Sequence, residues 1–586
     1  MTFQGEALAA YISDPANVSP QQREAVICNG NFFLSACPGS GKTRTIGVRL
    51  AYWSCTADQR IGRIRRIAAT SYTNTAINEI TFAAENAGQP VVDPNFAGTL
   101  HRFLMRYVVR SFASSLMECE GSPRIVPAGN ERAFREEVLS CKVGHTECLI
   151  PISDFEWRVD GLLTLSELPY ALRGKIDIDT LAANLQDSAK QGKLNSARRG
   201  VLSMSDALYW AMKCLEDQNI AKIVASRFDE IIVDEVQDTS DIQQRCLFLL
   251  CNAGLRSIVY VGDMQQAIYG FAHADPEVLV ELIKVTATQT LELSENWRSS
   301  QALCNVAHHF SGRSAPDTAV GPNKDDGLPP EIFFYDEGAP TQALDLFGRR
   351  LDSLGIEHHA AIVLCRWNAT TERLRGEPEV TLGRGLRTLV VAAEAARSDG
   401  ALERGIIRDV ENLVLSFVEP EIDLDEMSTD DHLKLRIRVM QLLDELPKFD
   451  VKCKEWTKVA RDAMTSLLGD MYSSASSPGY KIRTPSGAGE LSMLDVFGTA
   501  NAVPRIRTIH SAKGQSHAAT LLIAVDSSIM SPNWSSWLGE GEPEEVRVAY
   551  VALTRAQRYS ALALPNSCPK DVVEEYLSRG FIEAAN

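Results

Sequence analysis

The sequence predicts an α/β protein with two parallel sheets, in which each sheet domain carries a mostly helical insertion. Helical stretches alternate with six short apolar runs, at residues 31–37, 65–72, 228–235, 256–263, 359–366 and 519–526. Each run is continuously apolar, as expected for parallel strands that helices cover on both faces. The alternation of such strands with helices is typical of α/β architecture.

The length of 586 residues suggests about four domains, at roughly 150 residues per domain. Residues 106–204 and 385–500 contain no clear run of this kind, and we interpret both as insertions. The expected division is a first core from 1–105 and 205–290, and a second core from 291–384 and 501–586. Residues 473–490, rich in Ser, Gly and Pro, read as an exposed linker.

The composition limits the class of protein. The net charge of −17 argues against a protein that coats nucleic acid through bulk positive charge. Any contact with nucleic acid must then come from a few placed groups and from stacking. We expect a cytoplasmic protein without a membrane segment, because no apolar stretch reaches about 18 residues and no secretory signal is present. The 13 scattered cysteines form no CxxC pair and fit reduced thiols.

A phosphate-binding loop follows the first predicted strand. It consists of Pro38, Gly39, Ser40, Gly41, Lys42 and Thr43. Glycines let consecutive N–H groups point at an anion, and the following helix adds its positive dipole end. Lys42 would contact the β and γ phosphates, and the Thr43 hydroxyl would ligate Mg²⁺. Ala36 stands where the general pattern begins with Gly.

A second strand, at residues 228–235, ends in two carboxylates. We expect Asp234 to coordinate Mg²⁺ and Glu235 to orient or deprotonate the attacking water. An Asp-Glu pair at a strand end is by itself more often a solvated loop. Together with the phosphate loop it predicts a site for ATP and Mg²⁺.

Nine motif-like strings occur along the chain: Ser19–Val26, Ala36–Thr43, Ser71–Asn74, Gly98–His101, Val233–Thr239, Val261–Phe271, Glu295–Ser299, Thr508–Gly514 and Tyr550–Ala556. In this order they resemble the motifs of superfamily-one helicases of the UvrD/Rep/PcrA type, and the resemblance covers most of the chain. Any one string is a weak signal, but nine in order are specific. The resemblance implies two RecA-like P-loop domains, each with an inserted subdomain.

The resemblance also implies roles around the nucleotide. Gln22 would read adenine through its amide, with Trp297, in place of the usual Tyr, stacking on the base. Arg44 and Gly514 occupy two further nucleotide-binding positions of the family, and Gln266 would sense the γ-phosphate.

Two arginines complete the catalytic set that the resemblance implies. Arg298 and Arg555 would come from the second core and stabilise the charge of the phosphoryl-transfer transition state. Hydrolysis would then require closure of a cleft and would be coupled to movement.

The family positions that contact DNA are also present, at Tyr72, Asn74, Thr99, His101, Tyr269, Phe271, Thr508 and His510. Of these, Tyr72, Tyr269 and Phe271 match positions that stack on bases of a single strand. His101 and His510 fit a structural role equally well.

Several positions depart from the family pattern. Ala272 and Thr75 stand where the family has Arg and Lys, and Val546 replaces one arginine of the last motif. Gln515-Ser516 replaces a Leu-Glu pair, so the carboxylate that would bind the ribose is missing. The second insertion is also short for the family.

The short second insertion favours ATP-driven translocation along single-stranded DNA over processive unwinding, and the resemblance implies the 3′→5′ direction. We expect a translocase or helicase that acts on single-stranded or tailed duplex DNA in phage defence or DNA repair. The alternative is an ATP-loaded DNA sensor that licenses a separate nuclease subunit. In its size the chain is similar to the helicase component of Gabija-like anti-phage systems, which pairs with such a nuclease.

A zinc site near Cys119, Cys141, His145 and Cys148 is a weaker alternative, because the spacing fits no common ligand set and free cysteines are commoner.

Overall fold

The computed structural model describes residues 3–119, 121–125, 138–166, 168–268, 276–375, 382–397, 404–418, 424, 427–498, 505–525, 533–539 and 543–584. The chain packs into two compact units. Unit 1 consists of Met1–Leu328 and Gly539–Thr554, and unit 2 consists of Pro329–Leu538 and Arg555–Asn586.

Unit 1 is built on a parallel six-stranded sheet with the order β12-β1-β11-β10-β2-β3. Its strands are β1 (Phe32–Ala36), β2 (Ile67–Ser71), β3 (Phe96–Thr99), β10 (Glu230–Val233), β11 (Ile258–Gly262) and β12 (Gln289–Leu293). The four runs that the sequence predicted in this region are all strands, and they are the four central ones. The α/β prediction is confirmed here.

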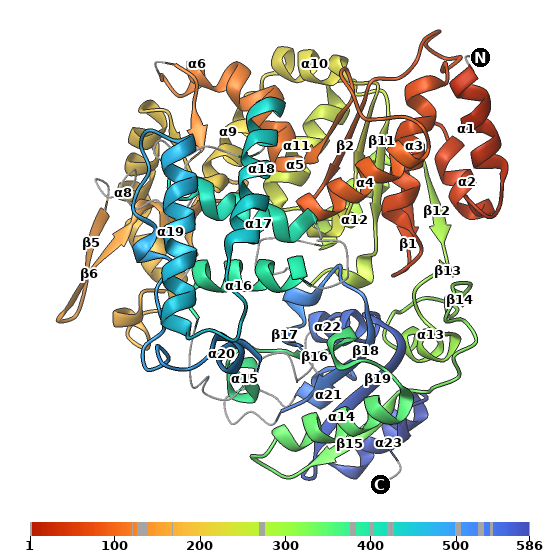
Figure 1. The fold of residues 1–586 in the computed structure, drawn as a ribbon. Coiled ribbons are helices and arrows are strands. Elements are labelled where there is room, and N and C mark those ends of the chain that lie inside the picture. Colours follow the sequence, from red (N-terminus) through yellow and green to blue (C-terminus); the bar gives the residue numbers. More distant parts are fainter. Residues whose placement is uncertain are drawn as a thin grey trace. The chain divides into compact units, whose positions relative to one another are not determined.

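Both faces of this sheet are buried, which explains the continuous apolar runs. Neighbouring residues of one strand, such as Ile231 and Ile232, point to opposite faces and belong to different hydrophobic clusters. One face packs against α3 (Lys42–Cys55) and α4 (Asn74–Asn86), which lie beside the strands in Figure 1. The other face joins a larger core that continues into the first insertion.

The other helices of unit 1 are α1 (Phe3–Ser13), α2 (Pro20–Ile27), α5 (Leu100–Leu104), the π-helical η1 (Met105–Ala113), α6 (Ser114–Leu116), α8 (Ile178–Arg198), α9 (Met204–Glu216), α10 (Gln218–Arg227), α11 (Asp241–Asn252), α12 (Pro276–Thr286), α13 (Gln301–His308) and α22 (Pro543–Leu553). Short 3₁₀ turns follow two strands of the sheet, η4 (Val236–Asp238) after β10 and η5 (Met264–Gln266) after β11.

The first insertion is less helical than the sequence suggested. Besides α8 it contains two antiparallel hairpins, β5 (Val138–Val143) with β6 (Thr146–Pro151), and β7 (Phe155–Trp157) with β8 (Leu163–Leu165). A short parallel pair, β4 (Arg124–Ile125) and β9 (Val201–Leu202), closes the segment. The hairpin strands bury only alternate residues, so they lack the continuous apolar runs by which the other strands were found.

Unit 2 contains a second parallel six-stranded sheet, with the order β17-β16-β18-β19-β15-β20 (Figure 1). Its strands are β15 (Glu331–Tyr335), β16 (Ala361–Cys365), β17 (Arg505–Thr508), β18 (His517–Ile523), β19 (Ala556–Pro565) and β20 (Ile582–Glu583). The two predicted runs of this region form β16 and most of β18. This sheet confirms the second α/β core.

Helices also make up the described part of the second insertion, which has a hydrophobic core of its own around Trp456. The helices of unit 2 are α14 (Thr341–Leu354), α15 (Asn368–Arg375), α16 (Arg384–Arg397), α17 (Arg404–Leu415), α18 (Thr429–Glu445), α19 (Cys453–Met471), α20 (Met493–Gly498), α21 (Asn533–Ser536) and α23 (Lys570–Ser578). No helix in the described ranges is both long and apolar enough to span a bilayer.

The units divide the chain differently from the expected boundary at residue 290. Residues 291–328 and 539–554, expected in the second core, pack with unit 1. The physical reason is that the chain leaving β12 stays at the phosphate loop, where the Trp297 amide donates to the Gly39 carbonyl at 2.9 Å. A short parallel pair, β13 (Glu295–Asn296) with β14 (Thr318–Ala319), holds this segment together. Arg298 is therefore a residue of unit 1.

A buried ionic network closes the amino-terminal end of the first sheet. The Glu230 carboxylate accepts hydrogen bonds from Arg49 at 2.8 and 2.7 Å and from Arg65 at 2.5 Å. Arg65 also pairs with Asp58 at 2.8 Å and lies over the Trp53 ring. Because these charges are shielded from water, each depends on its partners for compensation.

Replacing Glu230 by Ala should therefore lower the free energy of unfolding by about 3–5 kcal/mol, since it leaves two buried arginines short of a carboxylate. Urea unfolding followed by circular dichroism measures the effect. The control is Lys213→Ala, which breaks an exposed pair with Glu216 and should cost under about 1 kcal/mol. Equal unfolding midpoints for the two variants would contradict a stabilising network.

Candidate functional site

The candidate site of unit 1 lies at the carboxyl end of its parallel sheet. The phosphate loop follows β1, the Asp234-Glu235 pair follows β10, and Asp263 follows β11. These three strands are neighbours in the order β1-β11-β10. The carboxyl ends of parallel strands are where open α/β sheets bind ligands.

The phosphate loop has the backbone that its glycines predict. Gly39 and Gly41 adopt positive φ angles of 77° and 75°, which residues with a side chain rarely adopt. A Cβ atom at Gly39 would approach the Cβ of Arg298 to 2.6 Å, and one at Gly41 would approach the Gln22 amide nitrogen to 2.9 Å. Gly41 is also the N-cap of α3 and provides no side-chain cap, so the helix start is open to an anion.

Lys42 and Glu235 form an ion pair across the site, with Nζ 2.6 Å from Oε1. The lysine side chain is 15% exposed. Burial alone would lower the pKa of Lys42, but the carboxylates of Glu235 and Asp234 outweigh it and the pKa is raised. Lys42 is therefore a charged group held ready at the loop.

Asp234 has the properties of a cation ligand. Its side chain is buried, and its Oδ2 accepts a hydrogen bond from the Ser71 hydroxyl at 3.2 Å. Its Oδ1 is also buried and has no hydrogen-bond partner among the described residues. Burial, and then the neighbouring Glu235, raises the pKa of Asp234 to about 7. An unpartnered buried carboxylate oxygen beside a phosphate loop fits Mg²⁺, with Thr43 as the second expected protein ligand.

Glu235 is held in a strained backbone conformation. Its φ of 50° is one of two positive values among the described non-glycine residues. The Gln237 amide donates to Glu235 Oε2 at 2.6 Å and accepts from the Asp263 backbone N–H at 3.2 Å. Gly262 makes room for this arrangement, because a Cβ there would approach Gln237 Oε1 to 2.2 Å. The candidate base is thus tied to the end of the neighbouring strand.

Gln266, the candidate γ-phosphate sensor, is buried and donates from Nε2 to Asp263 Oδ2 at 2.9 Å. The Tyr550 hydroxyl, from α22, lies 3.3 Å from the same carboxylate oxygen. Gln266 therefore shares its partner with the helix of the last motif.

Arg298 lies beside Gly39, and its Nη1 donates to the carbonyl of Thr554 at 2.8 Å. No carboxylate lies within ion-pair distance of Arg298 in the described part of the chain. Burial lowers the pKa of Arg298, and the negative side chains of Glu235 and Glu79 offset part of that effect. A partly buried guanidinium without an ion pair, beside the phosphate loop, is well suited to an anionic ligand.

Trp297 and Gln22, the two candidate adenine-binding residues, differ in how accessible they are. Trp297 is 41% exposed next to the loop, so a flat face is available for stacking. Gln22 is buried, and its amide already donates to the Ser40 carbonyl at 2.9 Å and accepts from the Ser19 N–H at 3.2 Å. Gln22 thus holds the phosphate loop through the Ser40 carbonyl, and its binding to adenine stays a prediction. Arg44 is exposed and donates to the Tyr11 hydroxyl at 3.2 Å.

Four of the predicted nucleotide and DNA residues belong to unit 2. Arg555 is buried and donates to the Gln515 carbonyl at 3.2 Å, and Gly514 has a φ of 83°. Thr508 ends β17, and His510 begins the turn η10 (His510–Ala512) that follows. Their roles toward nucleotide and DNA stay predictions.

Four candidate DNA contacts come together in unit 1. Tyr72 and Asn74 follow β2, and Thr99 and His101 lie at the end of the adjacent β3, where Ser71 and Thr99 are register partners. Tyr72 is 46% exposed, as a stacking residue requires. Burial lowers the pKa of His101 to about 4, so its ring is neutral near pH 7. Tyr269 and Phe271 lie outside the described residues.

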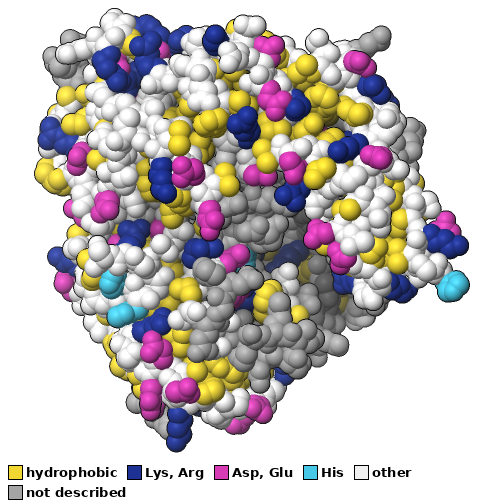
Figure 2. Space-filling model, turned by 180° about the vertical axis from the view of Figure 1, so that it is seen from behind, with side chains coloured by type: hydrophobic (Ala, Val, Ile, Leu, Met, Phe, Trp, Pro, Cys, Tyr) yellow, Lys and Arg dark blue, Asp and Glu magenta, His cyan; other side chains and the backbone are white. Residues whose placement is uncertain are grey.

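One face of the molecule shows how charged side chains are distributed over the described residues (Figure 2). On the described residues visible in Figure 2, Lys and Arg side chains are interspersed with Asp and Glu.

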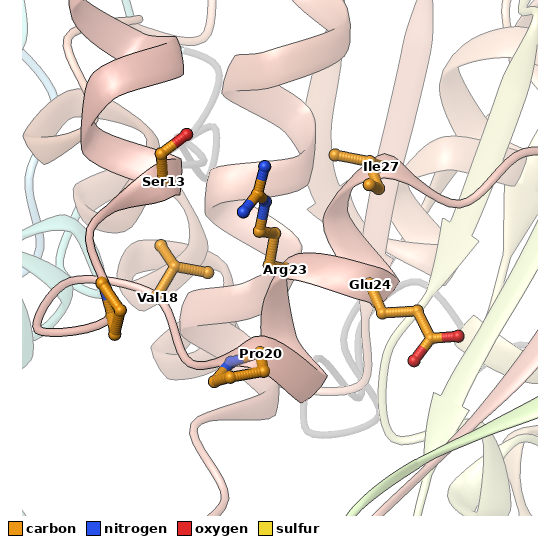
Figure 3. A pocket seen from close by; sticks show the side chains of 7 residues that line it. Ser13, Val18, Pro20, Arg23, Glu24 and Ile27 are labelled. Atoms are coloured by element: carbon orange, nitrogen blue, oxygen red, sulfur yellow. The ribbon is translucent and has the colours of Figure 1, made fainter.

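Figure 3 shows a small pocket on α2, lined by Pro20, Arg23, Glu24 and Ile27 with the end of α1. Helical spacing puts Gln22 on the opposite side of α2, so this pocket is separate from the phosphate loop.

The cysteines near residues 119–148 are not grouped as a zinc site requires in the described part of the chain. Cys141 and Cys148 face each other across the β5–β6 hairpin with their sulfur atoms 3.2 Å apart. The described residues contain no group of three or more His, Cys, Asp or Glu side chains placed to hold a metal ion. Free cysteines, the commoner outcome, are found at these positions.

Comparison with known proteins supports the motif-based resemblance. Residues 18–286 match the family model of the UvrD/REP helicase N-terminal domain. This part of the chain, just under half of its length, is therefore similar to the N-terminal domain of UvrD/REP helicases.

The chain is similar to two kinds of curated protein. It is 30% identical over 172 residues to an ATP-dependent helicase/nuclease subunit of Exiguobacterium sibiricum, covering 28% of this chain and 14% of the relative. It is 25% identical over 300 residues to the ATP-dependent DNA helicase PcrA of Staphylococcus epidermidis, covering 50% of this chain and 39% of the relative. The similarity thus spans well under half of these relatives.

Sequence reasoning missed the groups that hold the candidate catalytic residues. Ser71, Gln237 and Asp263 lie inside the quoted motifs, yet no role was predicted for them. Their side chains act on other side chains, and a linear motif gives no signal for that. The hydrogen bond from Arg298 to the Thr554 carbonyl could not be predicted either, because a backbone acceptor has no sequence signature.

Replacing Gly39 by Ala should abolish nucleotide binding, because the added Cβ strains a positive φ and collides with Arg298. Titration with a fluorescent ATP analogue measures the affinity. Gly30→Ala is the matched control: Gly30 has a φ of 91°, but nothing lies within 4 Å of its added Cβ. The steric account is wrong if both variants bind the nucleotide equally well.

Proposed function

We propose that this protein binds ATP with Mg²⁺ and uses its hydrolysis to move 3′→5′ along single-stranded DNA, separating strands of tailed duplexes where they block its path. The observation that carries the proposal is the geometry at the carboxyl end of the first sheet. An open phosphate loop, a lysine paired with the candidate base and an unpartnered buried carboxylate oxygen meet there. The family match over residues 18–286 supports the same activity.

In the proposed reaction each candidate residue of unit 1 has a separate role. The N–H groups at the start of α3 and the Lys42 ammonium bind the β and γ phosphates. Thr43 and Asp234 hold Mg²⁺, which neutralises phosphate charge when bound. Glu235 orients the attacking water and accepts its proton. Arg298 stabilises negative charge that develops on the transferred group.

The Lys42–Glu235 ion pair implies that phosphate binding precedes proton transfer to Glu235. While the loop is free of phosphate, the lysine neutralises the candidate base at 2.6 Å. A triphosphate would take over the lysine charge and release the Glu235 carboxylate to accept a proton. The base thus becomes available only when there is a substrate to hydrolyse.

Arg298 offers a route from hydrolysis to movement. Its guanidinium holds the Thr554 carbonyl, and Thr554 is the last residue of unit 1 before the chain enters unit 2 at Arg555. A shift of Arg298 toward a phosphate would weaken its hold on that carbonyl. We propose that Arg555 acts in the same hydrolysis step, as the motif resemblance implies.

DNA would be held by stacking and a few polar contacts rather than by bulk charge. The exposed Tyr72 ring and the polar ends of β2 and β3 provide such a surface in unit 1. Stacking tolerates any base sequence, so movement along DNA does not depend on sequence.

A second candidate function is an ATP-loaded DNA sensor that licenses a separate nuclease partner. The curated relatives whose names describe an ATP-dependent helicase/nuclease favour it, because each is named as one component of an assembly that joins the two activities. The absence of basic residues at Thr75 and Ala272 also weakens the expected hold on DNA. A role in phage defence or in DNA repair, with the likeness to Gabija-type helicase components, stays a prediction.

Lys42→Ala and Glu235→Gln should each lower ATP hydrolysis at least about 100-fold, since one removes a phosphate ligand and the other the base. A coupled assay measures turnover with and without single-stranded DNA and with EDTA, which should abolish activity. Wild-type hydrolysis should rise when DNA is added. Lys213→Ala, an exposed pair in the same unit, is the control. Hydrolysis by wild-type protein that ignores DNA would rule out the motor.

Tyr72→Ala should weaken binding of single-stranded DNA by about 1–3 kcal/mol, the usual worth of one stacked base. Fluorescence anisotropy with a labelled oligonucleotide gives the affinity at fixed salt. Phe82→Ala is the control, because Phe82 is an equally exposed aromatic residue on α4 with no predicted DNA role. If both substitutions have the same effect, Tyr72 is not a stacking residue.

A strand-displacement assay on tailed duplexes separates the two candidate functions. A motor displaces the strand at a rate that depends on ATP. A sensor binds ATP and DNA, co-purifies with its nuclease and leaves the duplex intact.

A further inference from the structure

The loop after α13 brings a cation into the centre of unit 1, at a position that no motif covers. Arg313 Nη2 lies 3.2 Å from Asp263 Oδ1, and its Nη1 lies 3.3 Å from Asp317 Oδ1. The arginine side chain is only 20% exposed. No role was predicted for Arg313 from the sequence.

The partner of Arg313 is the carboxylate on which the γ-phosphate sensor depends. Asp263 Oδ2 accepts from Gln266 Nε2 at 2.9 Å and from the Tyr550 hydroxyl at 3.3 Å, while Oδ1 accepts the Gln265 N–H at 3.1 Å. The Asp263 backbone N–H bonds to Gln237, whose amide holds Glu235. Asp263 therefore connects the candidate sensor, the candidate base and α22.

Charge explains why this carboxylate needs Arg313. Asp263 is buried, and a buried carboxylate must be compensated. Its other partners are neutral donors, and in the described part of the chain Arg313 is the cation within ion-pair distance of it. Arg313 in turn is held by Asp317, whose Oδ1 lies 3.3 Å from its Nη1. The contacts thus run from Asp317 through Arg313 to Asp263 and on to Gln266, the candidate sensor.

We infer that Arg313 is a positioning residue for ATP hydrolysis: it fixes the Asp263 carboxylate and thereby the geometry of Gln266 and Glu235. Arg313 does not touch the nucleotide in this role. The inference rests on the proposed function, because Gln266 and Glu235 have their roles there. Losing a positioning residue should slow turnover far more than it weakens ATP binding.

The test compares Arg313→Met, Arg313→Lys and the control Arg63→Met. Arg63 also pairs with a buried aspartate of unit 1, Asp229, but at the amino-terminal end of the sheet. Turnover, ATP affinity and melting temperature are measured for each protein. Arg313→Met should lower kcat about 100-fold with ATP affinity changed less than about 3-fold, and Arg313→Lys should recover part of the loss, because it restores the charge. Arg63→Met should retain kcat.

A second readout needs no turnover. Wild-type protein should bind a non-hydrolysable ATP analogue and ADP with different affinities, and Arg313→Met should lose that difference as Gln266→Ala does. Unchanged kcat and unchanged discrimination in Arg313→Met would overturn the inference, and so would a loss that tracks melting temperature in both Arg313→Met and Arg63→Met. Wild-type protein that binds and discriminates nucleotides without responding to DNA would instead contradict the proposed motor.

Discussion

The site depends on one constraint: parallel strands deliver their carboxyl ends to the same edge of a sheet. In unit 1 this brings the loop after β1, the carboxylates after β10 and Asp263 after β11 within bonding reach of one another. The ion pair between Lys42 and Glu235 is the direct product of that arrangement. Without it, the phosphate ligand and the candidate base would be distant residues of the chain with no common chemistry.

Around that pair, the structure compensates its buried charges one by one. Glu235 is shared between Lys42 and Gln237, and Asp263 between Arg313 and three neutral donors. Asp234 and Arg298 are the exceptions, one with an unpartnered oxygen and the other without an ion pair in the described part of the chain. Unmet charge of both signs at one phosphate loop is what a metal–triphosphate complex would satisfy.

The sequence predicted the four central strands of the first sheet, because burial on both faces leaves a continuous apolar run that needs no partner to be recognised. In the second sheet it predicted β16 and β18 but missed β15 and β19, although both are largely buried. It missed β12, which is largely exposed at the sheet edge, and the hairpins of the first insertion, which bury alternate residues. The motif residues at the phosphate loop were predictable because the backbone conformation favours Gly there, while phosphate and Mg²⁺ binding favour Lys and Thr. Arg313 and the Arg298–Thr554 contact were not, since both depend on how a loop returns to the sheet.

A structure determined with a non-hydrolysable ATP analogue and Mg²⁺ tests the central claim most directly. The account predicts β and γ phosphates against Gly39–Thr43, the metal on Asp234, and the Lys42 ammonium moved from Glu235 to phosphate. A nucleotide bound elsewhere, or one bound at the loop with the Lys42–Glu235 pair intact, would contradict it.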